Sequence, residues 1–216
     1  MCLRLAFLQC ILFLIVTFSL GQLPVGGFRI YNTTDGLPGS GLNKVYESRD
    51  GFLWVSTHSG LFRFDGYRSS PYFSNPQDST TLSSNSVTDI VEDASENLWV
   101  GTFGRGVCRY NKNQKRWYRY EHPTPDSNDF YWVMDLLYDS KQRLWVGTNG
   151  RGLLLYDPLN NKFKQFLPNP QKRRDGLVRF EKEVRHIAQD PVNADVLWLA
   201  CTDGLYKFNV QSKIFH

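Results

Sequence analysis

One short pattern occurs four times in this chain and constrains its fold more than any other feature. Each copy is an apolar run around a tryptophan, followed by a glycine-containing turn and a second apolar run, and the copies lie at 53–57, 98–102, 144–148 and 197–202. The tryptophans Trp54, Trp99, Trp145 and Trp198 stand 45, 46 and 53 residues apart. Self-similarity at a period of about 40–50 residues is typical of repeat architectures.

Each repeat contains four short runs of apolar or alternating residues separated by turn residues. In the second repeat these runs are 87–92, 97–102, 107–110 and 117–120, and a sustained 3.6-residue helical period is absent after the leader. Four antiparallel strands in about 45 residues form one blade of a β-propeller. We therefore predict an all-β propeller with four four-stranded antiparallel blades, the last incomplete, at about 42–73, 87–120, 133–167 and 184–216.

The repeated residues also predict how blades pack. A blade cannot bury both faces alone, so we expect each repeat tryptophan to pack against a neighbouring sheet, with Gly101 and Gly147 allowing close approach. Four blades leave two open apolar faces, which predicts an open arc of a larger propeller or association into a larger ring. The run 28–31 resembles an outer strand that precedes the first blade.

The first twenty-one residues differ from the rest of the chain. Arg4 is the only charge before Arg29, and residues 5–20 are almost wholly apolar. The small residues Ser19 and Gly21 follow, so 1–21 resembles a secretory signal peptide and indicates an exported, periplasmic protein. The alternative is an uncleaved N-terminal anchor, although the run is short for a membrane span of about 20 residues. Outside the leader, Cys108 and Cys201 are expected to be buried free thiols.

A family resemblance rests on the residues of the repeat. Within a repeat, the pattern Val-x5-Asp is followed by Leu-Trp-Val-Gly-Thr, then by Gly-Leu, and finally by an aromatic residue before Asp or Asn. This order is clearest at 90–111 and 136–157. This order resembles the two-component regulator propeller repeat over about residues 28–210. The resemblance implies the periplasmic sensor region of Bacteroidetes-type hybrid histidine kinases. Such sensors have two seven-bladed propellers, an immunoglobulin-like domain, a membrane helix and a kinase, and many recognise oligosaccharides.

The chain departs from the family pattern in several ways. It has four repeats rather than fourteen, and Ser56 and Ala200 stand where the second and third repeats have glycine. Glu96 and Gln142 stand at the position of Gly51 in the hairpin before the tryptophan. The sequence also lacks a kinase phospho-acceptor box and a nucleotide-binding glycine box. We therefore expect a fragment whose partners are the remaining propeller blades and kinase of a longer sensor, with a dimer as a further partnership.

The residues give little indication of catalysis, metal binding or nucleic-acid binding. Asp50 and Gly51 are adjacent, whereas the Asp-box of sialidase propellers needs a residue between them, and Asp93 and Asp139 are interpreted as turn formers. The four histidines stand apart from other metal-binding side chains, so neither a metal nor a cofactor is expected. The net charge of +4 is too balanced to indicate nucleic-acid binding. We expect no enzyme activity in this chain.

Ligand binding is the function that the loops favour. One long inter-blade loop, 122–132, contains Asp129, Tyr131 and Trp132, and a second, basic loop contains Arg173 and Arg174. Sugars stack on aromatic faces and hydrogen-bond to polar groups, and a basic loop suits an acidic sugar. The structural alternative is that both loops are solvated connectors with their aromatic residues in the core.

The predicted function is therefore ligand sensing in a periplasmic two-component sensor, with an oligosaccharide as ligand and a histidine kinase phosphorelay as output. Two alternatives from other classes stay open. One is a stand-alone secreted propeller that acts as an interaction scaffold, and the other is a glycan-cleaving propeller enzyme.

Overall fold

The computed structural model describes residues 29–38, 41–120, 132–167 and 183–216. The chain divides into two compact units, Met1–Tyr31 and Asn32–His216. In the first unit only 29–31 is described; these residues have no regular structure, and the Arg29 guanidinium lies 4.6 Å from the centre of the Tyr31 ring. The predicted signal peptide at 1–21 lies outside the described residues. Within the described part, no helix has the length and apolar character that a membrane crossing requires.

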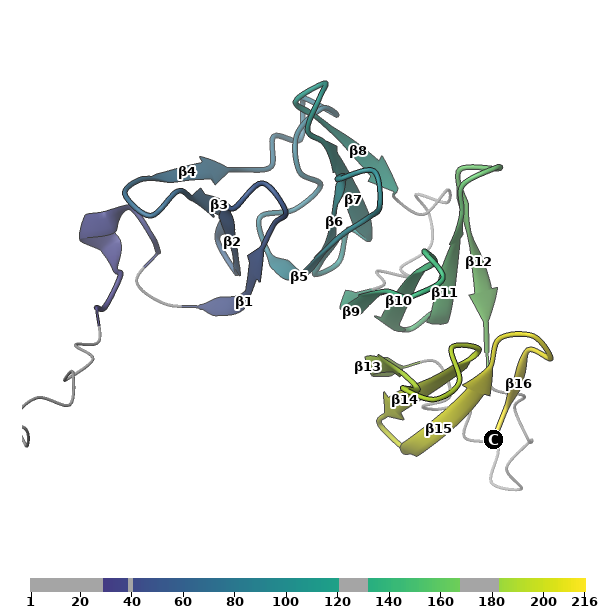
Figure 1. The fold of residues 1–216 in the computed structure, drawn as a ribbon. Coiled ribbons are helices and arrows are strands. Elements are labelled where there is room, and N and C mark those ends of the chain that lie inside the picture. Colours follow the sequence, from purple (N-terminus) through teal and green to yellow (C-terminus); the bar gives the residue numbers. More distant parts are fainter. Residues whose placement is uncertain (1–28, 39–40, 121–131, 168–182) are drawn as a thin grey trace, which may run out of the picture. The chain divides into compact units, whose positions relative to one another are not determined.

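The second unit consists of four separate antiparallel sheets (Figure 1). A short 3-10 helix, η1 (Thr33–Asp35), precedes them and is capped by Asn32. Within each sheet the four strands pair in chain order, so that every neighbour is joined by a hairpin. The strands are β1 Leu42–Glu47, β2 Leu53–Thr57, β3 Gly60–Phe64, β4 Ser69–Tyr72, β5 Val87–Glu92, β6 Leu98–Thr102, β7 Val107–Asn111, β8 Arg116–Tyr120, β9 Trp132–Tyr138, β10 Leu144–Asn149, β11 Gly152–Asp157, β12 Lys162–Phe166, β13 Val184–Gln189, β14 Val196–Cys201, β15 Gly204–Asn209 and β16 Ile214–Phe215.

The predicted fold class is confirmed: the described chain is all-β and contains four four-stranded antiparallel sheets. The hairpin between the first two strands explains one departure from the repeat pattern. Glu96 and Gln142 both have φ of 61°, and Gly51 has φ of 81° at the matching turn. This left-handed conformation is unusual for a residue other than glycine. The turn therefore has the same left-handed conformation in these three repeats, although only the first repeat has glycine there.

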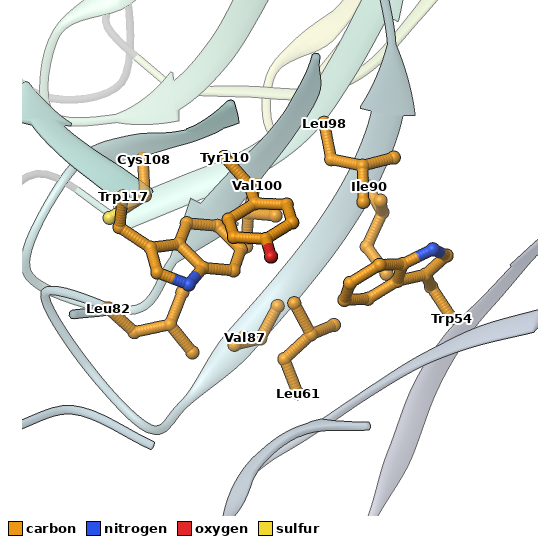
Figure 2. Close-up of a cluster of buried hydrophobic side chains, with 10 residues drawn as sticks. All are labelled: Trp54, Leu61, Leu82, Val87, Ile90, Leu98, Val100, Cys108, Tyr110 and Trp117. Atoms are coloured by element: carbon orange, nitrogen blue, oxygen red, sulfur yellow. The ribbon is translucent and has the colours of Figure 1, made fainter. Parts of the chain in front are cut away.

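Hydrophobic clusters join each sheet to the next one. The first cluster combines Trp54 and Leu61 of the first sheet with Val87, Ile90 and Leu98 of the second (Figure 2). The second cluster contains Trp99 and Val107 with residues of β9 and β10, and the third contains Trp145 and Leu153 with residues of β13 and β14. We call each of these contacts between successive sheets a junction. Trp54, Trp99 and Trp145 are almost fully buried there, whereas Trp198 in the last sheet is half-buried.

Two glycines of the repeat lie where a side chain would collide with the next sheet. A Cβ atom on Gly101 would lie 2.4 Å from Cγ1 of Val133, and one on Gly147 would lie 2.8 Å from the carbonyl oxygen of Val184. Contacts below 3.0 Å force one of the two atoms to move. At Gly147 that atom belongs to the backbone of β13, so the sheets themselves must separate.

We therefore expect Gly147→Ala to destabilise the protein by about 1 to 3 kcal/mol, as overpacking of a core does. The measurement is the free energy of unfolding in urea. Ser56→Ala is the matched control, because Ser56 occupies the same position in the first sheet, is fully buried and has a hydroxyl without a hydrogen-bond partner. It should change stability by less than about 0.5 kcal/mol. Equal effects of the two substitutions would contradict the steric argument.

The two cysteines in the described part are not joined in a disulfide. Cys108 is fully buried, but the expectation for Cys201 is wrong because this residue is only half-buried. Burial is still sufficient to raise the pKa of the Cys201 thiol to about 11, and the charge of Asp203 adds to the rise. Neither position therefore has the environment of a reactive thiolate.

Candidate functional site

A row of charged and titratable side chains lies along the first strand of each sheet. Lys44, Asp89, Asp135 and His186 occupy the same position in the four sheets, paired across to Ser56, Gly101, Gly147 and Ala200. The register of each of these strand pairs shifts next to this position. Bulges of this kind change the direction of a side chain and recur at functional sites.

The two aspartates of the row connect one sheet to the next. The backbone N–H of Leu136 donates to Oδ2 of Asp89 at 2.8 Å, and the backbone N–H of Ile187 donates to Oδ2 of Asp135 at 2.7 Å. In each case the donor belongs to the first strand of the following sheet. A buried carboxylate that accepts a backbone N–H in this way is a strong, directional link between two sheets.

An ion pair extends the row at one end, and a histidine contact extends it at the other. Lys44 Nζ lies 2.9 Å from Oδ1 of Asp89, and His186 Nδ1 lies 3.1 Å from Oδ2 of Asp135. Burial raises the pKa of Asp135 to about 6, and the negative charge of Asp89 adds to that rise. The Ile187 N–H and His186 act in the opposite direction. Since both carboxyls are buried and hydrogen-bonded, the row is suited to holding sheets together rather than to proton transfer to a substrate.

The aspartates that directly follow the first strands of the second and third sheets have a role that the sequence did not indicate. Asp93 and Asp139 accept the backbone N–H groups of Ser95 and Lys141, as turn formers do. They also accept the indole N–H groups of the repeat tryptophans, Trp99 and Trp145, at 2.8 Å. Each indole is therefore fixed by a hydrogen bond as well as by packing.

An exposed aromatic pair lies where the second and third sheets meet. The rings of Phe103 and Trp132 are stacked, with 3.9 Å between their centroids and 19° between their planes. Phe103 follows β6 and is 43% exposed, and Trp132 is the first residue of β9 and is half-buried. Gly104 lies next to the indole, since a Cβ there would be in ordinary van der Waals contact with Nε1 of Trp132, at 3.7 Å.

The predicted binding residues are placed unevenly. Trp132 lies in the aromatic pair, whereas Asp129, Tyr131, Arg173 and Arg174 lie outside the described residues. Sequence reasoning missed Phe103, although it directly follows the repeat pattern, and it missed the row on the first strands. The signal for the row was the spacing Val-x-Asp or Val-x-His at the start of those strands. Among the residues described, no group of three or more histidine, cysteine or acidic side chains could hold a metal ion.

Comparison with known proteins identifies the repeat. The family model described as "Two component regulator propeller" matches residues 81–104 and 125–150. The matched segments include Trp99 and Trp145, the central residues of two copies of the pattern. Residues 81–104 and 125–150 are two-component regulator propeller repeats. The resemblance inferred from the sequence is therefore confirmed.

The chain spans only part of the length of the proteins that it matches. A protein named Histidine kinase P4 from Formosa agariphila is 39% identical over 56 residues, which is 26% of this chain and 4% of that protein. Two solved extracellular domains of hybrid two-component systems from B. thetaiotaomicron are each 20% identical. The first has a TM-score of 0.71 and coverage of 87% of this chain and 26% of that chain. The second has a TM-score of 0.66, with 86% and 24% covered.

The fold is also shared with an enzyme. Virginiamycin B lyase from Staphylococcus aureus is 16% identical, with a TM-score of 0.57 and coverage of 83% of this chain and 56% of that chain. At such identities the likeness concerns the fold alone. The chain spans about a quarter of the length of the two sensor domains that it matches.

Proposed function

We propose that this chain is a ligand-sensing part of the periplasmic region of a hybrid two-component sensor, whose histidine kinase lies elsewhere in a longer protein. The observation that carries the proposal is the repeat itself: two-component regulator propeller repeats, folded into four sheets that match extracellular domains of such systems over most of the chain. The same likeness and the resemblance of residues 1–21 to a signal peptide support an exported location.

The proposed ligand is an oligosaccharide that stacks on the exposed Phe103–Trp132 pair. The C–H faces of sugar rings pack on aromatic rings, and nearby polar groups then bind the hydroxyls. Asp129 and Tyr131 directly precede Trp132 in the chain and are proposed as further ligand contacts. Arg173 and Arg174 are proposed to contact acidic groups of the sugar.

The position of the aromatic pair supports a mechanism for signalling. Phe103 belongs to the second sheet and Trp132 to the third, so a ligand on both rings contacts two sheets at once. Such a ligand binds best to one arrangement of those sheets, and a ligand shifts only an equilibrium whose states it distinguishes. Binding would thereby favour one arrangement of the propeller and of the partner domains.

Binding to a glycan array of neutral and acidic oligosaccharides tests this proposal. We expect Phe103→Ala and Trp132→Ala each to weaken binding of the best glycan about tenfold, the value of one stacking contact. Tyr67→Ala is the control, because Tyr67 is 86% exposed and lies outside the pair. Absence of glycan binding, or binding that survives both substitutions, would refute the aromatic site.

A stand-alone scaffold protein is the second candidate, because the first and last sheets expose apolar side chains that an interaction partner could cover. The gene distinguishes the two candidates. A reading frame that continues beyond His216 into further repeats and a kinase supports the sensor, and a stop codon there supports the scaffold. The third candidate, a glycan-cleaving enzyme, requires glycan turnover by the purified protein.

A further inference from the structure

The aromatic pair belongs to a set of equivalent positions at one edge of the sheets. His58, Phe103 and Asn149 each follow the buried threonine of the second strand in their sheet. The backbone N–H of Phe103 donates to the carbonyl oxygen of Ser86 at 2.9 Å, and Asn149 pairs with Trp132 at the same place in the third sheet. Ser86 and Trp132 lie at the start of the first strands, so all five residues share this edge.

The same positions also contact each other across the junctions. At the first junction, Nδ1 of His58 lies 3.4 Å from Oγ of Ser86. At the second junction, the ring of Phe103 stacks on Trp132. Contacts between sheets therefore alternate with strand pairing within sheets, and the residues form one continuous line. We call this line the rim; its members are His58, Ser86, Phe103, Trp132 and Asn149.

The packing of the sheets does not explain the aromatic residues of the rim. The position of Phe103 is polar in the other three sheets, with Thr202 in the last one, and Glu183 stands at the position of Trp132 in that sheet. The first junction is built without an aromatic residue at either position. Phe103 is 43% exposed, so much of its apolar surface stays in contact with water. A ligand that covers this surface gains hydrophobic free energy.

Hydrogen-bonding side chains flank the aromatic pair on both sides. On one side, His58 is exposed and Ser86 is half-buried. An imidazole has two nitrogens, and Nε2 of His58 can bind a hydroxyl group while Nδ1 faces Ser86. On the other side, the half-buried amide of Asn149 offers both donors and an acceptor. An aromatic centre with polar groups at both ends suits a chain of sugar units.

The length of the rim exceeds that of one sugar ring. Neighbouring strands of a sheet lie about 4.8 Å apart, and the centroids of the two stacked rings are 3.9 Å apart. The line from Ser86 to Asn149 includes two such strand spacings and the ring stack. A single sugar unit on the aromatic pair therefore does not reach both polar ends.

We propose that an oligosaccharide lies along the rim and contacts it with three consecutive sugar units. The central unit stacks on the aromatic pair, one outer unit binds His58 and Ser86, and the other outer unit binds Asn149. This inference rests on the proposed function, to which it adds a minimum ligand length and the residues that select it. Such a ligand contacts three sheets at once, because the rim begins in the first sheet and ends in the third.

Calorimetric titration of the purified 216-residue protein tests the proposal. The probes are unbranched oligosaccharides of two, three and four units in four series: β-1,4-linked glucose, mannose and xylose, and α-1,4-linked galacturonate. We expect at least one series to bind, with an affinity that rises from two to three units and then levels off. His58→Ala and Asn149→Ala should each weaken binding of the three-unit probe about fivefold, the value of one hydrogen bond.

The double variant with both substitutions should bind two, three and four units with affinities within about twofold of each other, whereas Phe103→Ala should weaken binding at every length. Thr202→Ala is the matched control, because Thr202 has the same position in the last sheet but lies outside the rim. It should leave all affinities unchanged. Circular dichroism of each variant verifies that the sheets are intact.

Three results would overturn the rim: binding by none of the four series, equal affinity for two and three units, or a length dependence that survives in the double variant. The glycan array separates this failure from that of the proposed function. Array binding that depends on Phe103, together with any of these three results, refutes the rim alone. Absence of binding on the array refutes the proposed oligosaccharide ligand as well.

Discussion

Trp145→Ala is expected to destabilise the protein by about 3 to 5 kcal/mol, the range for removing a large buried aromatic side chain. Trp145 is fully buried in the third junction and packs against Phe166 and Phe208. Its indole N–H also donates to Asp139 at 2.8 Å, and this acceptor would lose one of its partners. Urea unfolding of the purified protein measures the effect.

The last sheet supplies a matched control for this prediction. Trp198 has the same place in its repeat, and its indole donates to Asp190 at 2.9 Å, but it is only half-buried. Trp198→Ala should therefore lower the free energy of unfolding by clearly less, about 1 to 2 kcal/mol, because less apolar surface becomes exposed to water. Equal losses at the two positions would show that the tryptophans act within their own sheets and not at the junctions.

Asp135 is expected to make stability depend on pH between about pH 4 and pH 6. Its pKa rises from 3.8 to about 6 in the folded protein, first through burial and then through the charge of Asp89. The folded state therefore binds more protons than the unfolded state in this range, and stability falls as the pH rises through it. Above about pH 6 the contribution of Asp135 to stability no longer changes. Over the whole range the free energy of unfolding is expected to fall by about 2 to 3 kcal/mol.

The test compares the wild type with Asp135→Asn over a series of pH values. The amide oxygen of asparagine can still accept a hydrogen bond from the Ile187 N–H, but the amide group does not titrate in this pH range. The stability of this variant relative to the wild type should therefore rise between pH 4 and pH 6. Asp157→Asn is the control, because hydrogen bonds, first from Asn160, lower the pKa of exposed Asp157. Its difference from the wild type should be constant above about pH 4.5. A constant difference for Asp135→Asn would refute the prediction.

The candidate site was only partly accessible from the sequence. Trp132 was predicted as a ligand contact because it ends an aromatic loop, but its stacking partner Phe103 follows a strand of another sheet. The row from Lys44 to His186 was missed for the same reason. One aspartate or lysine in a strand has no evident role until the register places all four at one position in successive sheets.

The sequence by itself determined the number of sheets, their strand order and the family of the repeat, because strand patterns and turn residues act over a few positions of the chain. Only the tertiary structure decided which copies of the repeat are buried. Leu153 and Leu205 follow the same kind of turn after the same kind of strand, yet one is fully buried and the other is 66% exposed. The physical reason is that hydrophobic burial depends on the neighbouring sheet, which residues distant in the sequence supply.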